Sequence, residues 1–448
     1  MPTAQRTRPP WPLPLAGAAT VPGAYAGLAD YAGLPIVELS PFLAAAVFGG
    51  AIVGAAFLLS WAAEAAEVEV SAGVALAFLA LLAVLPEYGV DFVFTMRAGQ
   101  TVAEQGHCAA SGGSDPCSLA LANMTGANRV LVGLGWPLVV LVAALIARRN
   151  PGKTSREPSV PSPGHVRLAN TMSVEVVFLG AATVYSLTLP LRHTLTLIDA
   201  GVLLTLFGLY AWRLAQAPVE EPELKGTSAW VAEKDRKARR WWLMALFLTA
   251  AAVILMTAEH FADAVVHSGT QLHIDEFLLV QWAAPVASEA PELIVACLYA
   301  WRLRASQALG ALLSSKVNQW TLLVGSIPIV FAIASASLHG LPLSTHQRFE
   351  LLITAAQSMF AVSLLVNLRL SMWGASALMS LFLVQFATSI LLPEAANQVV
   401  MVALSAVYLG SALALFIRER HRGAKVIRDG LVADLKHLEE WDDQPATR

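Results

Sequence analysis

Charged side chains are scarce in this sequence. Aspartate, glutamate, lysine and arginine account for only 14% of the 448 residues, whereas 56% are hydrophobic. Soluble domains usually contain about 25% charged residues, so this composition excludes an ordinary soluble protein and indicates a polytopic membrane protein. The formal net charge is −3, and the absence of a positive excess argues against nucleic acid as a partner. We expect the lipid bilayer to be the main partner.

Cysteine is also scarce, with three residues in the whole chain. Cys108 and Cys117 share one short polar loop, and we expect a disulfide between them if that loop faces an oxidising compartment. No cysteine or histidine spacing typical of a metal site is present, and no bound cofactor is expected. The sequence also lacks the His-Glu-x-x-His and Gly-x-Ser-x-Gly motifs of hydrolases, which disfavours an intramembrane enzyme.

Long apolar stretches dominate the rest of the chain. A helix that crosses a bilayer takes about 20 residues, and eleven stretches are long enough: 41–66, 70–96, 119–147, 170–190, 195–215, 241–265, 273–301, 306–336, 347–368, 373–393 and 396–417. The sequence therefore predicts an all-α membrane protein with about ten core transmembrane helices and one extra C-terminal helix. Residues 1–40 are expected to form an irregular tail, because Pro12, Pro14 and Pro22 interrupt their short apolar run.

Lysine and arginine are distributed unevenly between the loops. Most of them fall after the first, third, fifth, seventh and ninth spans and in the tail 418–448. Cytoplasmic loops carry the excess of positive charge in membrane proteins, so these segments are expected in the cytoplasm. The Cys108/Cys117 loop and the N-terminus are then outside and the C-terminus is cytoplasmic, with the chain in the plasma (inner) membrane. The C-terminal tail itself is expected to contain a short amphipathic helix.

Two parts of the chain, at about 70–147 and about 273–336, resemble each other. In each, an apolar helix with Pro-Glu near its middle precedes a helix that opens with small and polar residues. The loop pattern gives the two copies opposite orientations, as in secondary transporters whose inverted repeats form a binding site near the bilayer midplane. The chain is therefore expected to comprise a first inverted half (41–215), a cytoplasmic linker (216–240), a second inverted half (241–393) and an extra transmembrane helix (394–417).

Each repeat carries a proline directly before a glutamate. Pro86 precedes Glu87, and Pro291 precedes Glu292. Proline removes a backbone hydrogen bond, so we expect both prolines to break their helices and to free carbonyl oxygens beside the carboxylates. Such irregular backbone is tolerated at membrane depth only where it lines a cavity or is buried in protein.

Two more carboxylates accompany these glutamates. Asp91 lies one turn after Glu87, and Glu289 lies one turn before Glu292. Buried charges can be structural ion pairs, but four carboxylates at equivalent points of two repeats favour a functional site, since charges at membrane depth are costly. Anionic sites built from oxygen suit hard cations such as Ca²⁺ or Na⁺.

These segments resemble the cation/calcium exchanger superfamily, the sodium/calcium exchanger-like membrane antiporters. Its members carry two inverted repeats, each with a Gly-Thr-Ser-x-Pro-Glu type helix followed by a Gly-Asn-x-x-Gly-Ser-Asn type helix. The matching segments here are "LAVLPE" (82–87) with "ANMTGAN" (122–128), and "ASEAPE" (287–292) with "GALLSSK" (310–316). The resemblance implies alternating access, in which the ion ligands face each side of the membrane in turn.

The resemblance also implies a set of cation-binding residues. Glu87 and Glu292 match the family's two essential carboxylates, and Ser288 and Ser315 match hydroxyl ligands of the second repeat. Asn123 and Asn128 lie on the repeat motif, and Gln319 stands where sodium-coupled members often have aspartate or asparagine. Asp91 and Glu289 complete the candidate set, although Glu289 replaces a serine of the family pattern. This chain departs from the family pattern at Ala83, Val84 and Ala127, which replace hydroxyl residues, and at Lys316, which replaces asparagine. Sodium ligands are therefore fewer than in sodium-coupled members.

Two basic residues at membrane depth are expected to compensate part of the negative charge. Arg129 and Lys316 leave two negative charges from the four carboxylates, which one Ca²⁺, two Na⁺ or two protons would balance. We therefore expect a secondary-active antiporter of inorganic cations that exports Ca²⁺ in exchange for Na⁺ or H⁺. The alternatives are a monovalent cation/proton antiporter on the same fold and a transport-inactive relative.

Overall fold

The computed structural model describes residues 9–34, 39–66, 68, 85–108, 115–149, 164–216, 224, 226–272, 276–435 and 438. The helices are α1 (Pro12–Tyr31), α2 (Pro41–Ala66), α4 (Leu85–Gln105), α5 (Pro116–Val130), α6 (Trp136–Arg149), α7 (Ser173–Ser186), α8 (Leu197–Leu214), α9 (Thr227–Ala232), α10 (Arg236–Leu272), α11 (Glu276–Trp301), α12 (Ala305–Asn318), α13 (Val324–Ala334), α14 (Thr345–Leu365), α15 (Met372–Leu391), α16 (Glu394–Arg418) and α17 (Arg420–Leu431). Short helical turns are η1 (Leu131–Gly135), η2 (Asn170–Met172), η3 (Leu189–Leu191) and η4 (Gln319–Leu323). The strands are β1 (His165–Arg167), β2 (Thr194–Leu195), β3 (Leu341–Pro342) and β4 (Arg369–Ser371).

Nine helical segments in the described part of the chain are long and apolar enough to cross a membrane. They are Pro41–Ala66, Pro116–Arg149, Asn170–Leu191, Leu197–Leu214, Arg236–Gly269, Ala305–Ala334, Thr345–Leu365, Met372–Leu391 and Glu394–Arg418. A shorter apolar segment covers Glu292–Trp301. The predicted all-α membrane fold is therefore confirmed, while residues 70–84 of the predicted second span lie outside the described residues.

The chain divides into two compact units. The first comprises Met1–Phe94 and Pro218–Pro291, and the second comprises Thr95–Ala217 and Glu292–Arg448. Both divisions fall inside helices, because α4 and α11 each contribute residues to both units. These are the two helices that carry the predicted carboxylates.

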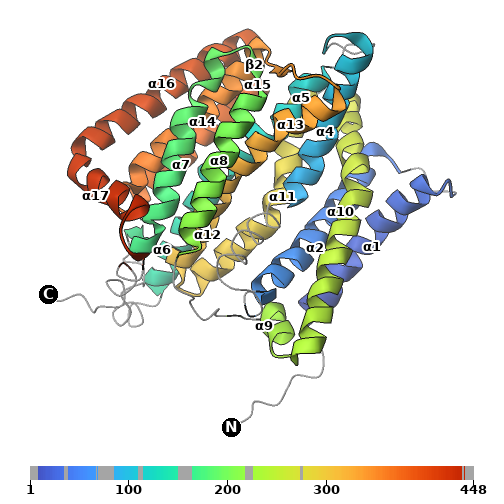
Figure 1. Cartoon of the computed structure of the whole chain (residues 1–448), viewed down its shortest axis with the longest axis horizontal. Coiled ribbons are helices and arrows are strands. Elements are labelled where there is room, and N and C mark those ends of the chain that lie inside the picture. The colour runs from blue at the N-terminus through green and yellow to red at the C-terminus, as the bar shows by residue number, and fades with distance from the viewer. Residues whose placement is uncertain are drawn as a thin grey trace. The chain divides into compact units, whose positions relative to one another are not determined.

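In the first unit, α1 and α10 both pack against α2, as the blue and yellow-green ribbons of Figure 1 show. The core is built mainly from alanine and leucine, including Ala55, Ala62 and Ala250, none of which is exposed. Small side chains let helix backbones approach closely, which is how helices associate in a membrane.

Helix α1 corrects the expectation that residues 1–40 are irregular. Pro12 and Pro14 lie at the start of the helix, where an N–H has no helical partner and proline is therefore tolerated. Pro22 lies inside the helix. Packing offsets its cost, because Gly23 and Gly27 bring α1 so close to α2 and α10 that a Cβ would collide with Ala51 and with the Met256 carbonyl.

The second unit contains the second helix of each repeat, the C-terminal parts of α4 and α11, and the C-terminal helices. α14 packs most extensively against α16, and α17 packs against α7. The expected amphipathic helix in the tail corresponds to α17, where Val426, Asp429 and Gly430 are buried. Arg213 of α8 holds the end of α17 against α8, because its guanidinium donates hydrogen bonds to the carbonyl oxygens of Gly430 and Ala433.

Two short antiparallel strand pairs fix the ends of the second unit. β1 pairs with β4, and β2 pairs with β3. Because α7 lies between β1 and β2 in the chain, the two pairs close opposite ends of this helix. The loops that contain β1 and β4 therefore lie at one end of α7, and those that contain β2 and β3 lie at the other end.

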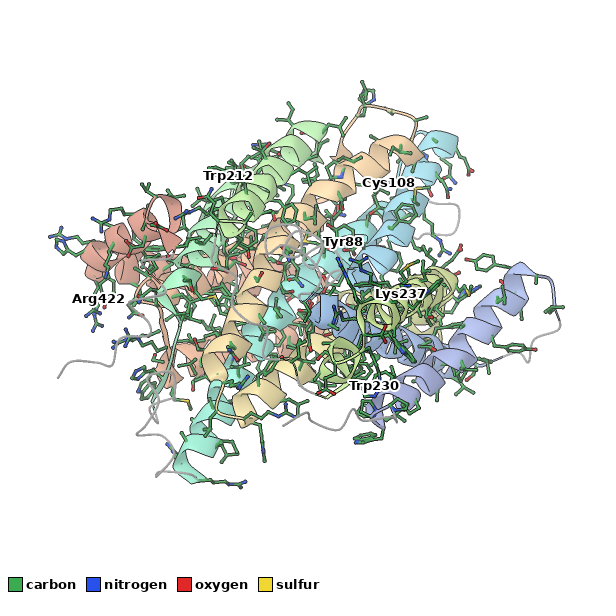
Figure 2. All side chains as sticks on the ribbon, turned by 60° about the horizontal axis from the view of Figure 1, so that its bottom comes forward. Tyr88, Cys108, Trp212, Trp230, Lys237 and Arg422 are labelled. Carbon is green, nitrogen blue, oxygen red and sulfur yellow. A yellow bond between two sulfur atoms is a disulfide. The ribbon has the colours of Figure 1, made fainter. Side chains whose placement is uncertain are left out.

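Large apolar side chains cover the outer surfaces of the helices. Leu248 and Leu255 of α10 and Trp212 of α8 are 64%, 74% and 65% exposed. Figure 2 shows Trp212 at the outer edge of its helix. Surfaces of this kind suit a bilayer rather than water.

Candidate cation site

The second helix of each repeat is interrupted by a π-helical turn at an equivalent place. In the first repeat α5 passes through η1 into α6, and in the second α12 passes through η4 into α13. The turns begin three residues after Asn128 and three residues after Lys316. Single π-helical turns inside α-helices occur frequently at functional sites. The predicted repeats are therefore matched in backbone detail as well as in sequence.

Asn128 and Lys316 contact each other. Lys316 Nζ lies 2.6 Å from the carbonyl oxygen of Asn128 and 2.7 Å from its Oδ1. Both residues are fully buried. The amide nitrogen of Asn128 donates to Met124 O at 3.0 Å, which points Oδ1 toward the ammonium. Two oxygens of a predicted ligand residue therefore accept hydrogen bonds from a buried lysine side chain.

Arg129 is paired with a carboxylate that the sequence analysis did not single out. Its Nη2 lies 2.7 Å from Glu350 Oε2, and the side chains are 0% and 1% exposed. Arg129 Nε also donates to Thr125 O at 3.2 Å. The sequence could have indicated Glu350, because it is an ionisable residue within the predicted span 347–368 and such residues in transmembrane segments are rarely without a role. Arg129, which we expected to offset the charge of the predicted carboxylates, therefore offsets the charge of Glu350 as well.

The carboxylates of the first repeat lie on α4 in the first unit. Glu87 and Asp91 are 2% and 3% exposed and share one helix face, because four residues make about one turn. Gly89, between them, lets α4 approach α10 closely, since a Cβ there would collide with Ile254. The predicted break at Pro86 depends partly on residues before Leu85, which lie outside the described residues.

The carboxylates of the second repeat lie on α11. Ser288 and Glu289 belong to the first unit and are 5% and 0% exposed, whereas Glu292 belongs to the second unit and is partly buried. α11 runs through Pro291 as one helix, so the expected break at this proline is wrong. Proline still has no N–H to give to the carbonyl four residues earlier.

The remaining predicted ligands lie in the second unit on the interrupted helices. Asn123 and Gln319 are 0% exposed and Ser315 is 6% exposed. The Ser315 hydroxyl has no hydrogen-bond partner within the described part of the chain, whereas the Ser288 hydroxyl lies 3.4 Å from the carbonyl oxygens of Ala284 and Pro285. Of the two predicted hydroxyl ligands, Ser315 is therefore the one whose hydroxyl can still form a hydrogen bond or bind a cation.

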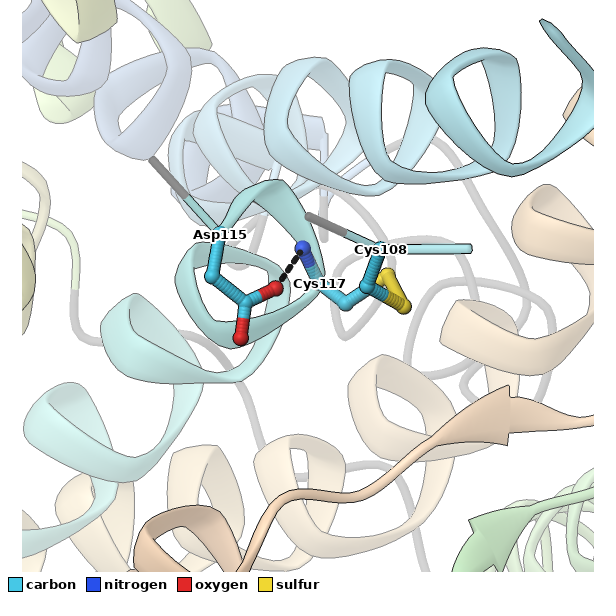
Figure 3. Close-up of side chains that lie close together, drawn as sticks. All are labelled: Cys108, Asp115 and Cys117. Atoms are coloured by element: carbon cyan, nitrogen blue, oxygen red, sulfur yellow. Dashed lines mark hydrogen bonds between the residues drawn. A yellow bond between two sulfur atoms is a disulfide. The ribbon is translucent and has the colours of Figure 1, made fainter. Parts of the chain in front are cut away.

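A disulfide joins Cys108, beyond the end of α4, to Cys117, in the first turn of α5 (Figure 3). Asp115 caps α5, because its Oδ1 accepts from the backbone nitrogens of Cys117 and Ser118 at 3.1 and 3.3 Å. Burial raises the pKa of the Asp115 carboxyl, and these two hydrogen bonds oppose the rise. The sulfur atoms lie near the Asp115 carboxylate, but a disulfide does not supply the thiolates that a metal site needs.

Comparison with known proteins decides the family. The sequence model of the family described as "Sodium/calcium exchanger protein" matches residues 40–215 and 242–391, which is well over half of the chain. The chain belongs to this family. The crystal structure of an H⁺/Ca²⁺ exchanger, CAX, is similar over 96% of this chain and 98% of that one, with 37% sequence identity and a TM-score of 0.82.

A second solved structure shows the fold alone. Native YfkE matches 84% of this chain and all of that chain (100%), with 13% identity and a TM-score of 0.54. No curated protein matches the sequence. As a member of the exchanger family the chain is an integral membrane protein and a cation antiporter, and its relatives are transporters rather than enzymes. The resemblance stated from the repeat motifs is confirmed.

Proposed function

We propose that this exchanger works by alternating access and exports Ca²⁺ from the cytoplasm in exchange for protons. The similar protein CAX is described as an H⁺/Ca²⁺ exchanger. Glu87, Asp91 and Glu289 are almost fully buried, and Glu292 is partly buried. Carboxylates, and hydroxyls such as those of Ser288 and Ser315, are the oxygen ligands that a hard divalent cation prefers. The ligands that we assign from the repeat motifs and their carboxylates are these residues together with Asn123, Asn128 and Gln319.

The Lys316 ammonium is the single observation that carries the choice of protons over sodium. It lies at 2.6 and 2.7 Å from two oxygens of Asn128, the residue that the family pattern assigns as a ligand. These oxygens would otherwise be available to a monovalent cation. A fixed positive charge removes the need for a bound sodium ion there, so sodium is not required as the exchanged ion.

Protons suit the remaining carboxylates. A carboxylate that releases a divalent cation in a low-dielectric site needs another positive charge, and a proton supplies one without any coordination geometry. Arg129 adds little to the balance while Glu350 stays ionised, because the two charges are matched at 2.7 Å. Protons therefore serve as the exchanged ion in this proposal.

Sidedness follows from the charge distribution of the loops. We place the protein in the plasma (inner) membrane with the disulfide face outside, where oxidation is possible, and with the C-terminal tail in the cytoplasm. Basic residues of α17, including Arg420, Arg422 and Lys425, are exposed. Arg422 points away from the ribbon in Figure 2.

Ca²⁺ uptake by the reconstituted protein tests the proposal. Vesicles with an acidic interior are diluted into Ca²⁺ at higher pH, with and without Na⁺ or K⁺ on either side. We expect uptake that follows the pH gradient and is unchanged by sodium. Strict dependence on a sodium gradient would overturn the proton assignment, and proton-coupled uptake of Na⁺ or K⁺ without Ca²⁺ would favour the monovalent antiporter. No transport of any cation by folded protein would indicate a transport-inactive relative.

A further inference from the structure

An open apolar groove lies on the surface of the second unit, between α6 and the C-terminal part of α11. Its volume is about 340 Å³, and its lining includes Leu138 and Val142 of α6 and Leu293, Leu298 and Trp301 of α11. Leu298 and Trp301 are 51% and 54% exposed. Hydrophobic surfaces of this kind on a membrane protein face the acyl chains of lipids. The groove therefore has a size and polarity that suit part of one acyl chain.

Each helix that forms the groove ends in arginine. Trp301 is the last residue of α11, and exposed Arg302 follows it directly. α6 ends at Arg148 and Arg149, which are exposed and lie roughly two turns beyond Val142. An apolar lining is therefore followed by guanidinium groups on both walls of the groove.

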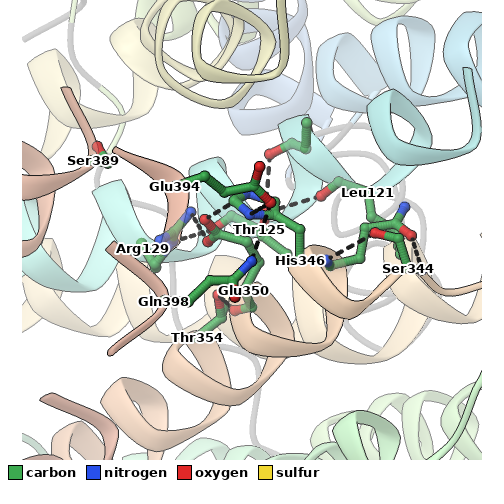
Figure 4. Close-up of polar contacts among 12 residues, drawn as sticks. Leu121, Thr125, Arg129, Ser344, His346, Glu350, Thr354, Ser389, Glu394 and Gln398 are labelled. Carbon is green, nitrogen blue, oxygen red and sulfur yellow. Dashed lines mark hydrogen bonds and ion pairs between the residues drawn. The ribbon is translucent and has the colours of Figure 1, made fainter. Parts of the chain in front are cut away.

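The arginines of α6 lie at the end of the second unit opposite the disulfide. α5, η1 and α6 form one helical segment, Pro116–Arg149, with disulfide-bonded Cys117 in its first turn. The start of α14 also lies at the disulfide end, because Gln347 Nε2 donates to Cys117 O at 2.6 Å. Figure 4 shows this start of α14, at Ser344 and His346, beside α5. The last turn of α6 is therefore at the opposite end of the unit.

The turn between α11 and α12 lies at the same end as the last turn of α6. α12 continues through η4 into α13, and α13 contacts β3, the strand that comes just before α14. α12, at the other end of that segment, contacts β1 and α6. Figure 1 shows α6 and α12 together, away from β2. Arg302, just before α12, therefore lies at the same end as Arg148 and Arg149, and we call these three residues the groove arginines.

Two more arginines face each other across the strands at this end. Arg167 of β1 and Arg369 of β4 are directly opposite in the antiparallel register, and both are exposed. Like charges opposite each other destabilise a strand pair. Burial, and then the positive charges of Arg369 and Arg167, lower the pKa of the neighbouring His165. The electrostatic potential at this end is therefore positive, which favours an anionic partner.

The carboxylates of α17, which contacts η2 at this end, pair with basic residues of their own segment. Glu419 accepts a hydrogen bond from Arg422 at 2.9 Å, and Asp429 lies 3.7 Å from Arg428. Within the described part of the chain, no carboxylate forms an ion pair with a groove arginine. The groove arginines are therefore available to an anion from outside the chain.

We propose that the groove binds an anionic phospholipid, with one acyl chain against α6 and α11 and the phosphate on the groove arginines. Arginine binds phosphate through paired hydrogen bonds and stays charged at physiological pH. Trp301 lies where the apolar lining meets arginine, and tryptophan is enriched at the boundary between hydrocarbon and headgroups. Basic pockets between transmembrane helices at the cytoplasmic side suit anionic headgroups, and this is the end that we propose to be cytoplasmic.

Other occupants satisfy only part of this surface. In a two-fold symmetric dimer the same surface meets itself, so a second copy of the chain would bring the groove arginines of both copies together. A small anion would pair with the arginines and leave the apolar lining uncovered. A lipid with a negative headgroup matches both the lining and the charge.

Lipid binding to the purified full-length protein tests this inference without ion transport. Delipidated protein in detergent is mixed with equal amounts of phosphatidylglycerol and phosphatidylcholine that carry the same acyl chains, and native mass spectrometry counts the lipids retained. We expect at least roughly tenfold more phosphatidylglycerol than phosphatidylcholine, because each basic residue near the membrane surface favours anionic lipid. The combined change Arg148→Gln, Arg149→Gln and Arg302→Gln should abolish this preference.

A charge-matched control removes three exposed basic residues from α17 instead. Arg420→Gln, Arg422→Gln and Lys425→Gln together should leave the preference for phosphatidylglycerol unchanged. Equal retention of the two lipids by the folded wild-type protein would overturn the inference. So would the same loss of preference in the α17 control, because the preference would then reflect net charge rather than this site.

Cys297 allows the apolar part of the site to be tested separately. It lines the groove and is a free cysteine. Cys297→Trp should fill the groove and lower the retained phosphatidylglycerol to the level of phosphatidylcholine, whereas Cys297→Ser should bind as wild type. Displacement of the lipid by millimolar inorganic phosphate, with no effect of Cys297→Trp, would show a site for a small anion only and contradict the inference. A lipid-free dimer would assign the groove to a second copy. Absence of proton-driven Ca²⁺ uptake would contradict the proposed function and leave these lipid measurements unaffected.

Discussion

Lys316 and Asn128 occupy equivalent positions of the two inverted repeats and touch each other. They are separated by 188 residues, and Lys316 Nζ lies 2.7 Å from Asn128 Oδ1. The same separation relates the π-helical turns that begin at Leu131 and at Gln319. Because these equivalent residues touch, the pseudo-two-fold axis that relates the two repeat helices passes between Asn128 and Lys316. Lys316 therefore lies where the second helices of the two repeats meet, and it contacts oxygen atoms of the other repeat.

Replacement of Lys316 by glutamine is expected to remove proton-only coupling. The two Asn128 oxygens lose a charge-assisted partner, and a monovalent cation has to take the place of the ammonium. Ca²⁺ uptake should become dependent on Na⁺ or K⁺, or stop. Lys425→Gln, on the exposed surface of α17, is the control and should transport as wild type. Unchanged, sodium-independent uptake by Lys316→Gln would contradict the role assigned to the built-in cation.

Stability should depend strongly on the pair of Arg129 and Glu350. Arg129→Met leaves a buried carboxylate without its cation, and removal of one member of such a pair typically costs about 3–5 kcal/mol. Arg129→Met with Glu350→Leu removes both charges and should be far less destabilised. Thermal unfolding in detergent, followed by intrinsic fluorescence, distinguishes these cases. Equal losses for the single and double variants would show that the ion pair is not what holds α5 to α14.

The proposed carboxylate ligands should each be needed for flux. Glu87→Gln and Glu292→Gln keep the size of the side chain but remove the negative charge, so Ca²⁺ uptake should fall below detection. Glu104→Gln changes an exposed carboxylate near the end of the same helix as Glu87 and should leave uptake intact. Retained uptake in either ligand variant, with normal folding, would exclude that residue from the site.

The disulfide provides a direct test of sidedness. In a Cys297→Ser background, mild reduction of intact cells should make Cys108 and Cys117 react with a membrane-impermeant maleimide. Loss of the nine-residue link should lower stability by about 2–3 kcal/mol, because the unfolded chain regains conformational entropy. Labelling only after the cells are opened would place this loop in the cytoplasm and reverse the proposed orientation.

Much of the fold follows from local sequence pattern. Apolar runs of spanning length predicted the transmembrane helices, since a lipid-exposed backbone must satisfy its hydrogen bonds within the helix. The pattern failed at α1, where proline suggested irregularity, because proline in the first turn is compatible with a helix. It also failed at Pro291, where α11 continues. Both errors came from treating proline as a helix breaker irrespective of its surroundings.

The site residues were recognisable, but their partners were not. The repeat motifs singled out Asn128, Arg129 and Lys316, yet no local pattern indicates that Lys316 reaches Asn128. The pairing of Arg129 with Glu350 depends on α14 packing against α5, which is a tertiary arrangement. Residues 221 positions apart become neighbours only in the fold. The sequence shows which ionisable and polar residues each helix carries. Which of these charges are paired depends on which helices pack together.

Proton movement driven by a Ca²⁺ gradient tests the central claim most directly. Vesicles that contain the purified protein and a trapped pH indicator, with no Na⁺ or K⁺ on either side, receive Ca²⁺ on the outside. We expect protons to leave the vesicles as Ca²⁺ enters, Glu292→Gln to abolish the signal and Glu104→Gln to preserve it. Ca²⁺ entry without proton movement, or proton movement only after sodium is added, would contradict proton-coupled Ca²⁺ exchange.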